Sequence, residues 1–131
     1  MSQQAPVEVI DRELDRLEGL WASGLADTYR SYLGAVTAYE PTAQPKLALA
    51  AALIEVGIRL QGLGGRAAPP PTLLMGDLCL ARASRLLADN APQEVQVAFA
   101  RAIEAISVAA ASSHAGPPIH QALLDALALG R

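Results

Sequence analysis

The chain has 131 residues and a formal net charge of −3, with 52% hydrophobic but only 4% aromatic residues. That length is typical of one domain, and no basic cluster supplies the positive stripe that nucleic-acid binding usually needs. A single cysteine rules out an internal disulfide and fits a reducing compartment, and residues 1–6 lack the pattern of a signal peptide. No apolar run is long enough to span a bilayer, so we expect a soluble, cytoplasmic protein without a transmembrane segment.

Alanine and leucine supply most of the apolar content, and both favour helices, which predicts an all-α, single-domain bundle of about five helices. The mean hydropathy is +0.26, which is high for a short soluble chain. A domain of this size buries roughly two thirds of its surface on folding. We therefore expect another chain to cover part of the apolar surface, the alternative being a compact monomer with an ordinary apolar surface.

A first helix is predicted to begin near Val7, after a flexible segment over residues 1–6. Its apolar residues recur every three or four positions, at Ile10, Leu14, Leu17, Trp21, Leu25 and Tyr29 or Tyr32. Gly24 predicts a bend or break near residues 23–24. The segment ends at residues 40–42, because a residue before proline resists helical dihedral angles.

A second helix, from about Pro45 to Gln61, is apolar almost all round, as expected at the centre of a bundle. Glu55 and Arg59 stand four residues apart and are expected to pair on an exposed face. A linker over residues 62–71, glycine-rich and then proline-rich, follows this helix.

Three more helices are predicted. The first starts after Thr72, its N-cap, and runs to about residue 88, the second runs from residue 92 or 93 to about residue 112, and the third covers residues 119–129. The apolar stripe of the first of these contains an acid and a hydroxyl, at Leu73, Asp77, Leu80, Ser84 and Leu87. The stripe of the next is Val95, Phe99, Ala102, Ile106 and Ala109, and that of the last is Ile119, Leu123, Leu124 and Leu127.

Because a buried unpaired charge is costly, an acid on an apolar stripe needs partners. We therefore predict that Asp77 and Ser84 are buried polar residues, with the Asp77 carboxylate bonded to a neighbouring helix or a loop amide. The alternative interpretation is a contact between Asp77 and a ligand or substrate.

Few other residues have the spacing of a chemical site. Asp11 and Asp15 share a helix face, but arginines flank them, so a solvated helix face explains them better. His114 and His120 stand six residues apart across two prolines, which is not a helical metal-ligand spacing. Cys79 lies in an apolar run and is expected to be an inert core thiol. We predict no catalytic, cofactor-binding or metal-binding residue in this chain.

The segment from Leu74 to Ala88 resembles a helix of the trans-type polyprenyl diphosphate synthases. In that helix a Gly-Asp pair precedes apolar residues, an Ala-x-Ala element and Leu-Leu-Ala. Residues 92–107 are similar to the helix that follows in that family, and residues 44–53 to the helix that begins at its lysine-arginine-proline motif. The parts occur in the same order over residues 45–112, which implies a shortened isoprenoid-synthase-like fold.

The chain departs from those enzymes where they bind metal. The family ionises an allylic diphosphate with magnesium held by two aspartate-rich motifs, whereas no two aspartates are adjacent in this sequence. Between Lys46 and Gly76, where the first motif is expected, Glu55 is the one acid. Without clustered carboxylates nothing holds the metal ions that neutralise the leaving diphosphate.

What the chain resembles is therefore the small subunit, component I, of the heterodimeric hexaprenyl and heptaprenyl diphosphate synthases, which lacks both motifs. The resemblance implies a non-catalytic subunit that activates a catalytic large subunit and helps to set prenyl chain length for quinone side chains, as in menaquinone biosynthesis. Magnesium is then expected in the partner subunit. Leu74, Met75 and Leu78 are candidates for the product tunnel or the interface.

Two other hypotheses stay open at this point. The chain is also compatible with a generic helical interaction module that forms a homo-oligomer and has no prenyl chemistry, and even a synthase subunit can form a homodimer when isolated. A third hypothesis is a small enzyme that uses Asp77 together with His114 or His120.

Overall fold

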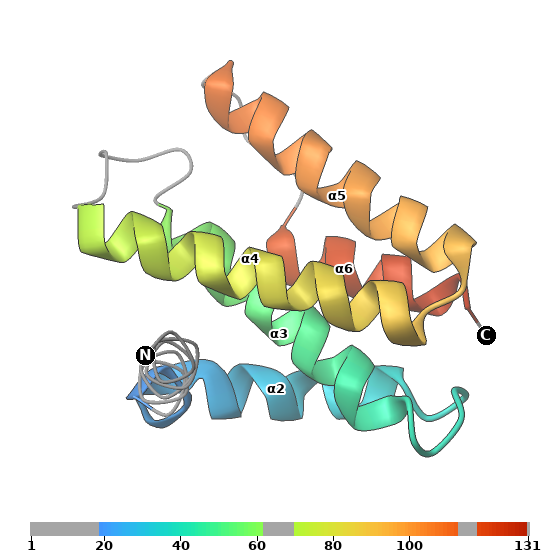
Figure 1. The fold of residues 1–131 in the computed structure, drawn as a ribbon. Helices are drawn as coiled ribbons and strands as arrows, with labels where there is room; N and C mark the ends of the chain where they lie inside the picture. The colour runs from blue at the N-terminus through green and yellow to red at the C-terminus, as the bar shows by residue number, and fades with distance from the viewer. Residues whose placement is uncertain (1–18, 62–69, 113–117, 131) are drawn as a thin grey trace, which may run out of the picture.

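The computed structural model describes residues 19–61, 70–112 and 118–130, and every regular element in these ranges is a helix (Figure 1). The predicted all-α bundle is thereby confirmed. The elements are a π-helical turn η1 (Trp21–Leu25), α2 (Ala26–Tyr32), a 3-10 turn η2 (Leu33–Ala35), α3 (Gln44–Leu60), α4 (Pro70–Asn90), α5 (Gln93–Ala111) and α6 (Ile119–Ala128).

Some of the predicted features lie outside the described residues. These are the start of the first helix with Asp11 and Asp15, the linker over residues 62–69, and His114.

Gly24 interrupts the first helical segment at the predicted bend. Its φ is +142°, a conformation that only glycine adopts without strain, and it lies within η1. The Thr28 hydroxyl donates a hydrogen bond of 3.2 Å to the Gly24 carbonyl. The bend separates the turn that carries Trp21 from α2, which packs along α3.

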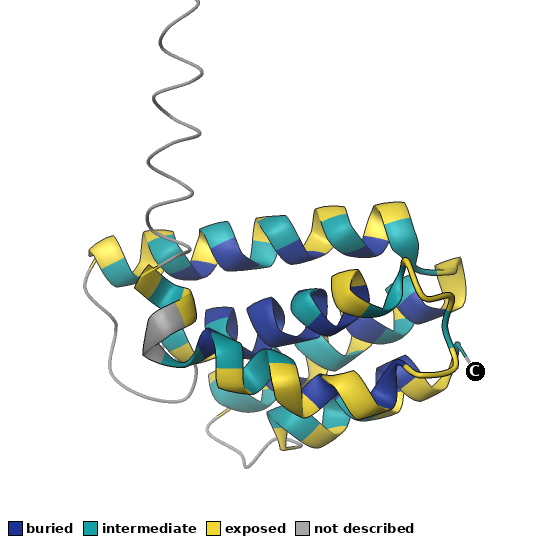
Figure 2. Cartoon of the chain, turned by 90° about the horizontal axis from the view of Figure 1, so that it is seen from below, coloured by how far each residue is buried: buried dark blue, intermediate teal, exposed yellow. Residues whose placement is uncertain are grey.

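Helix α3 is the central element, in contact with α2, α4 and α6 (Figure 1). Ten of its 17 residues are buried, as its nearly uniform apolar sequence predicts. Buried positions on the surrounding helices turn toward the middle of the bundle and exposed positions turn outward (Figure 2). The Tyr39 hydroxyl, in the turn before α3, donates a 2.5 Å hydrogen bond to the Leu127 carbonyl and thereby joins that turn to α6.

Two glycines face each other where α3 crosses α4. A Cβ atom on Gly57 would lie 3.1 Å from the Gly76 carbonyl oxygen, and a Cβ atom on Gly76 would lie 3.0 Å from the Gly57 carbonyl oxygen. Because neither residue has a side chain, the two backbones approach closely. This contact fixes how α4 is rotated about its axis.

The buried residues of α4 are consequently Gly76, Cys79, Ala83 and Leu87. The prediction that Asp77 and Ser84 belong to the buried stripe is wrong, since both are exposed. Their burial would place a carboxylate and a hydroxyl against the apolar surface of α3. Small residues occupy those positions instead and permit the close crossing.

Helix α4 also begins before Thr72, the predicted N-cap. Pro70 and Pro71 belong to its first turn rather than to the linker. Proline is tolerated there because the first turn needs no intrahelical N–H donor and because its fixed φ suits a helix. The boundaries of the last two helices agree with the prediction to within about one residue.

Candidate functional site

Helix α4 presents an apolar stripe away from α3. Leu74 is 62% exposed, Leu78 is half-buried and Ala81 is exposed, and these residues follow one another at helical spacing. A shallow hollow, lined by Leu78, Ala81, Arg82 and Arg85, continues this surface. We call Leu74, Leu78, Ala81 and Arg85 the α4 outer face. Met75, the other predicted interface residue, is half-buried.

Asp77 lies beside this face and has a specific partner. Its Oδ1 atom accepts a 2.6 Å hydrogen bond from Gln61 Nε2, at the carboxyl end of α3. The exposed carboxylate therefore helps to hold the start of α4 against the end of α3, next to the crossing of Gly57 and Gly76.

The buried charge of the described chain is Glu55, which is 3% exposed in the middle of α3. Its Oε1 atom accepts hydrogen bonds from Tyr32 Oη at 2.5 Å and from His120 Nδ1 at 3.0 Å. Its Oε2 atom lies 2.6 Å from Arg59 Nη2. The predicted ion pair between Glu55 and Arg59 is present. The prediction that the pair lies on an exposed face was wrong, because only the arginine reaches the surface.

This polar cluster of Tyr32, Glu55, Arg59 and His120 joins three helices, α2, α3 and α6. Burial, and next the hydrogen bond to Glu55, raise the pKa of the Tyr32 hydroxyl above its ordinary value, since ionisation would place a second negative charge beside the carboxylate. The tyrosine hydroxyl therefore acts as a neutral donor. The His120 and Tyr32 rings also pack together, with centroids 4.6 Å apart.

Sequence reasoning missed Tyr32 and His120 as partners of Glu55. The available signal was an acid at a position of α3 where every neighbouring residue is apolar. Such an acid requires donors from other helices, but the spacing of 23 and 65 residues to those donors carries no local pattern. Asp77 and His120, which one hypothesis combined in an enzyme site, are hydrogen-bonded to different partners. Asp77 bonds to Gln61 and His120 bonds to Glu55.

Cys79 occupies the core, as predicted. It is fully buried beneath α3, and burial raises the pKa of its thiol to about 11. Because the thiolate is the reactive form of cysteine, we expect this buried thiol to react slowly at neutral pH.

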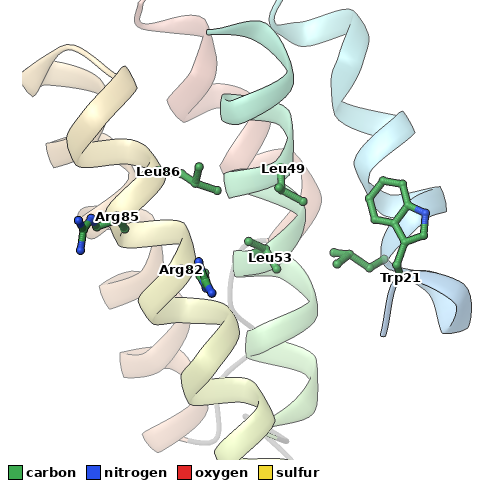
Figure 3. A pocket seen from close by; sticks show the side chains of 7 residues that line it. Trp21, Leu49, Leu53, Arg82, Arg85 and Leu86 are labelled. Atoms are coloured by element: carbon green, nitrogen blue, oxygen red, sulfur yellow. The ribbon is translucent and has the colours of Figure 1, made fainter. Parts of the chain in front are cut away.

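A groove lies between η1, α3 and α4 (Figure 3). Its volume is about 270 Å³. It is lined by Trp21 and Leu25 from η1, Leu49 and Leu53 from α3, and Arg82, Arg85 and Leu86 from α4. The walls are almost entirely aliphatic or aromatic, and the two arginines lie at the α4 side.

Within residues 19–61, 70–112 and 118–130, no three His, Cys, Asp or Glu side chains are arranged to hold a metal ion. None of the helices described there has both the length and the apolar character needed to cross a membrane. Comparisons with protein-family models, with curated proteins and with solved structures found no match.

Proposed function

We propose that this chain is a non-catalytic subunit of a heterodimeric polyprenyl diphosphate synthase and that it binds the catalytic subunit through the α4 outer face. The observation that carries the proposal is how the Gly76-Asp77 segment of α4 packs against α3. Gly76 packs against Gly57, and the Leu74, Leu78 and Ala81 side chains are left at the surface.

The exposed apolar residues support a second chain as the binding partner. Leu74 is 62% exposed and shares this face with the partly exposed Leu78, at the end of α4 where Asp77 holds the helix to α3. Apolar residues that gather on one face of a rigid helix are typical of a surface that a partner covers.

The mechanism we propose is geometric. The chain buries the α4 outer face against the catalytic subunit, orders that subunit's helices and forms part of the wall along which the growing prenyl chain lies. Leu74, Met75 and Leu78 supply apolar contacts for this role. The metal-assisted ionisation belongs to the partner, because this sequence has no adjacent aspartates to bind magnesium.

The proposal is tested by co-purification of the chain with a candidate catalytic subunit from the same source. The variant Leu74→Asp with Leu78→Asp places two charges on the α4 outer face and is expected to abolish co-elution. Leu129→Asp is the matched control, because Leu129 is 57% exposed beyond the end of α6. Equal co-elution of both variants would contradict the assignment of this face.

A further inference from the structure

Helix α5 lies at one edge of the bundle and packs mainly against α6 (Figure 1). Three of its 19 residues, Val95, Phe99 and Ile106, are buried. On the opposite side of the helix, Val97 is 39% exposed and Val108 is 58% exposed. Helix α5 therefore presents apolar side chains on a side that the other described elements leave uncovered.

Two shallow hollows follow this side of the helix. One has a volume of about 550 Å³ and is lined by Arg101, Glu104, Ala105, Val108, Ala109 and Ser112. The other has a volume of about 450 Å³, lies between α5 and α6, and includes Val97 and Arg101 in its wall. Because the two hollows adjoin at Arg101, they form one extended surface along α5. An occupant that fits this length and shape is another helix.

We call Val97, Arg101, Glu104 and Val108 the α5 outer face. These residues are spaced by four, three and four positions, which is the spacing of side chains that pack one helix against another. Arg101 and Glu104 are exposed, and within the described ranges neither side chain has a hydrogen-bond or ion-pair partner. The face thus offers one positive and one negative charge between two valines.

The order of these residues makes the α5 outer face complementary to itself. Arg101 and Glu104 lie symmetrically about the point between residues 102 and 103, and so do Val97 and Val108. When two copies of α5 pack antiparallel about a two-fold axis through that point, Arg101 of each copy meets Glu104 of the other. Val97 of each copy likewise meets Val108 of the other. Each favourable contact therefore forms twice, as in an isologous dimer.

We propose that the α5 outer face is the interface of a homodimer in which two copies of α5 pack antiparallel. A parallel arrangement would place each charge beside the same charge of the second copy, which opposes association. Glu94, the remaining charged residue of α5, lies opposite Ala111 in the antiparallel dimer and meets no like charge. None of these residues belongs to the α4 outer face, so the homodimer does not depend on the proposed function.

The first test is the mass of the chain in solution, measured by analytical ultracentrifugation, with circular dichroism as a check on folding. We expect twice the 13.6 kDa mass of one chain. Arg101→Glu and Glu104→Arg are each expected to weaken the dimer at least about tenfold, because like charges then meet across the interface. Arg30→Glu and Glu40→Arg make the same changes in charge at exposed positions on other segments and are expected to remain dimers. A monomeric wild-type chain, or charge variants of α5 as dimeric as these controls, would overturn the proposal.

A mixture of the two α5 variants gives a sharper test. Arg101→Glu has a negative charge at both positions and Glu104→Arg has a positive charge at both, so an antiparallel pair of unlike chains regains both ion pairs. We expect a 1:1 heterodimer in the mixture. Leu74→Asp with Leu78→Asp, on the α4 outer face, is expected to remain a homodimer. If mixing restores no dimer, or if the α4 variant is a monomer, self-association does not use the α5 outer face and the proposal is wrong.

Cysteine cross-linking tests the antiparallel register. Val97→Cys and Val108→Cys are made in separate chains, both in a Cys79→Ala background. Positions 97 and 108 are about 17 Å apart along the helix, whereas a disulfide requires Cα atoms within about 7 Å. Under mild oxidation we therefore expect a disulfide-linked dimer from the mixture of both variants and none from either variant alone. A linked dimer from one variant alone would show a different register and contradict the proposed interface.

Discussion

A carboxylate inside a helical bundle is stable only when its oxygens are hydrogen-bonded, because burial removes the water that would otherwise solvate the charge. Glu55 satisfies this condition with donors from three helices: Tyr32 from α2, Arg59 from its own helix and His120 from α6. The cluster thus specifies how α2 and α6 sit against α3. The polar cluster stabilises the centre of the bundle, and it lies on a different side of α3 from the contact with Gly76.

The Tyr32 hydroxyl is the most deeply buried donor to this carboxylate. Tyr32→Phe keeps the ring but removes the 2.5 Å hydrogen bond to Glu55. We expect the free energy of unfolding to fall by about 2 kcal/mol, as for a bond to a charged group. Urea denaturation measures this change. Tyr29→Phe is the matched control, since the Tyr29 hydroxyl has no hydrogen-bond partner within the described ranges, and an equal loss in both variants would contradict the account.

Cys79 gives a prediction about pH. Because burial raises the pKa of its thiol to about 11 from an ordinary value near 9, the unfolded chain loses this proton at lower pH than the folded chain. The contribution of Cys79 to the free energy of unfolding therefore does not change with pH below about pH 9. It falls as pH rises from about 9 toward 11. The expected result is a lower urea midpoint at pH 10 than at pH 8, with a smaller decrease in Cys79→Ala.

Reactivity offers an independent check of the same residue. A thiol reagent at pH 8 is expected to modify Cys79 rapidly in urea and at least tenfold more slowly in the native protein. Equal rates in the two conditions would show that the thiol is accessible in the folded chain.

At the scale of elements, the contact between α3 and α4 depends on two glycines. A Cβ atom on Gly57 would lie 3.1 to 3.2 Å from the Gly76 carbonyl oxygen, Leu80 Cγ and Cys79 Cβ, of which the first belongs to the backbone and cannot rotate away. Gly57→Val is expected to lower the free energy of unfolding by about 2 kcal/mol through overpacking.

Gly34→Val is the comparison for that variant, because nothing lies within 4 Å of a Cβ atom at Gly34. Thermal denaturation of both proteins measures the difference. If Gly57→Val melts at the same temperature as Gly34→Val, the close crossing does not stabilise the bundle.

Local patterns in the sequence were enough to predict the helices but not their rotation. The apolar repeat predicted the described helices and Gly24 predicted the bend, because these effects act within a few residues, whereas the start of α4 at Pro70 was wrongly placed at Thr72. The predicted rotation of α4 about its axis was wrong by one residue position, because Gly76 faces α3 where Asp77 was expected. Hydrophobic periodicity locates apolar side chains only. It gives no signal for a pair of glycines, although two glycines allow two helices to pack more closely than leucines do.

The candidate surfaces were predictable only in part. Leu74 and Leu78 were named from the sequence, and both remain at least partly exposed. The groove at Trp21 was not foreseen, since it is assembled from three segments separated by tens of residues. Its formation also depends on the backbone bend at Gly24, whose direction no local pattern specifies.

At the scale of the whole molecule, two surfaces meet along α4. Arg82 and Arg85 line both the groove and the hollow next to Leu78 and Ala81. The groove and the surface that we propose for partner binding therefore lie on adjoining sides of one helix. A partner that covers the α4 outer face is expected to contact the groove as well if it extends over these arginines.

The most direct test of the proposed function is a prenyl-transfer assay of a candidate catalytic subunit, with and without an equimolar amount of this chain. We predict that adding the chain increases the rate and changes the length of the prenyl product, and that the chain alone forms no product with magnesium and isoprenoid diphosphates. Equal rates and equal product lengths with and without the chain, or turnover by the chain alone, would contradict its assignment as a non-catalytic subunit.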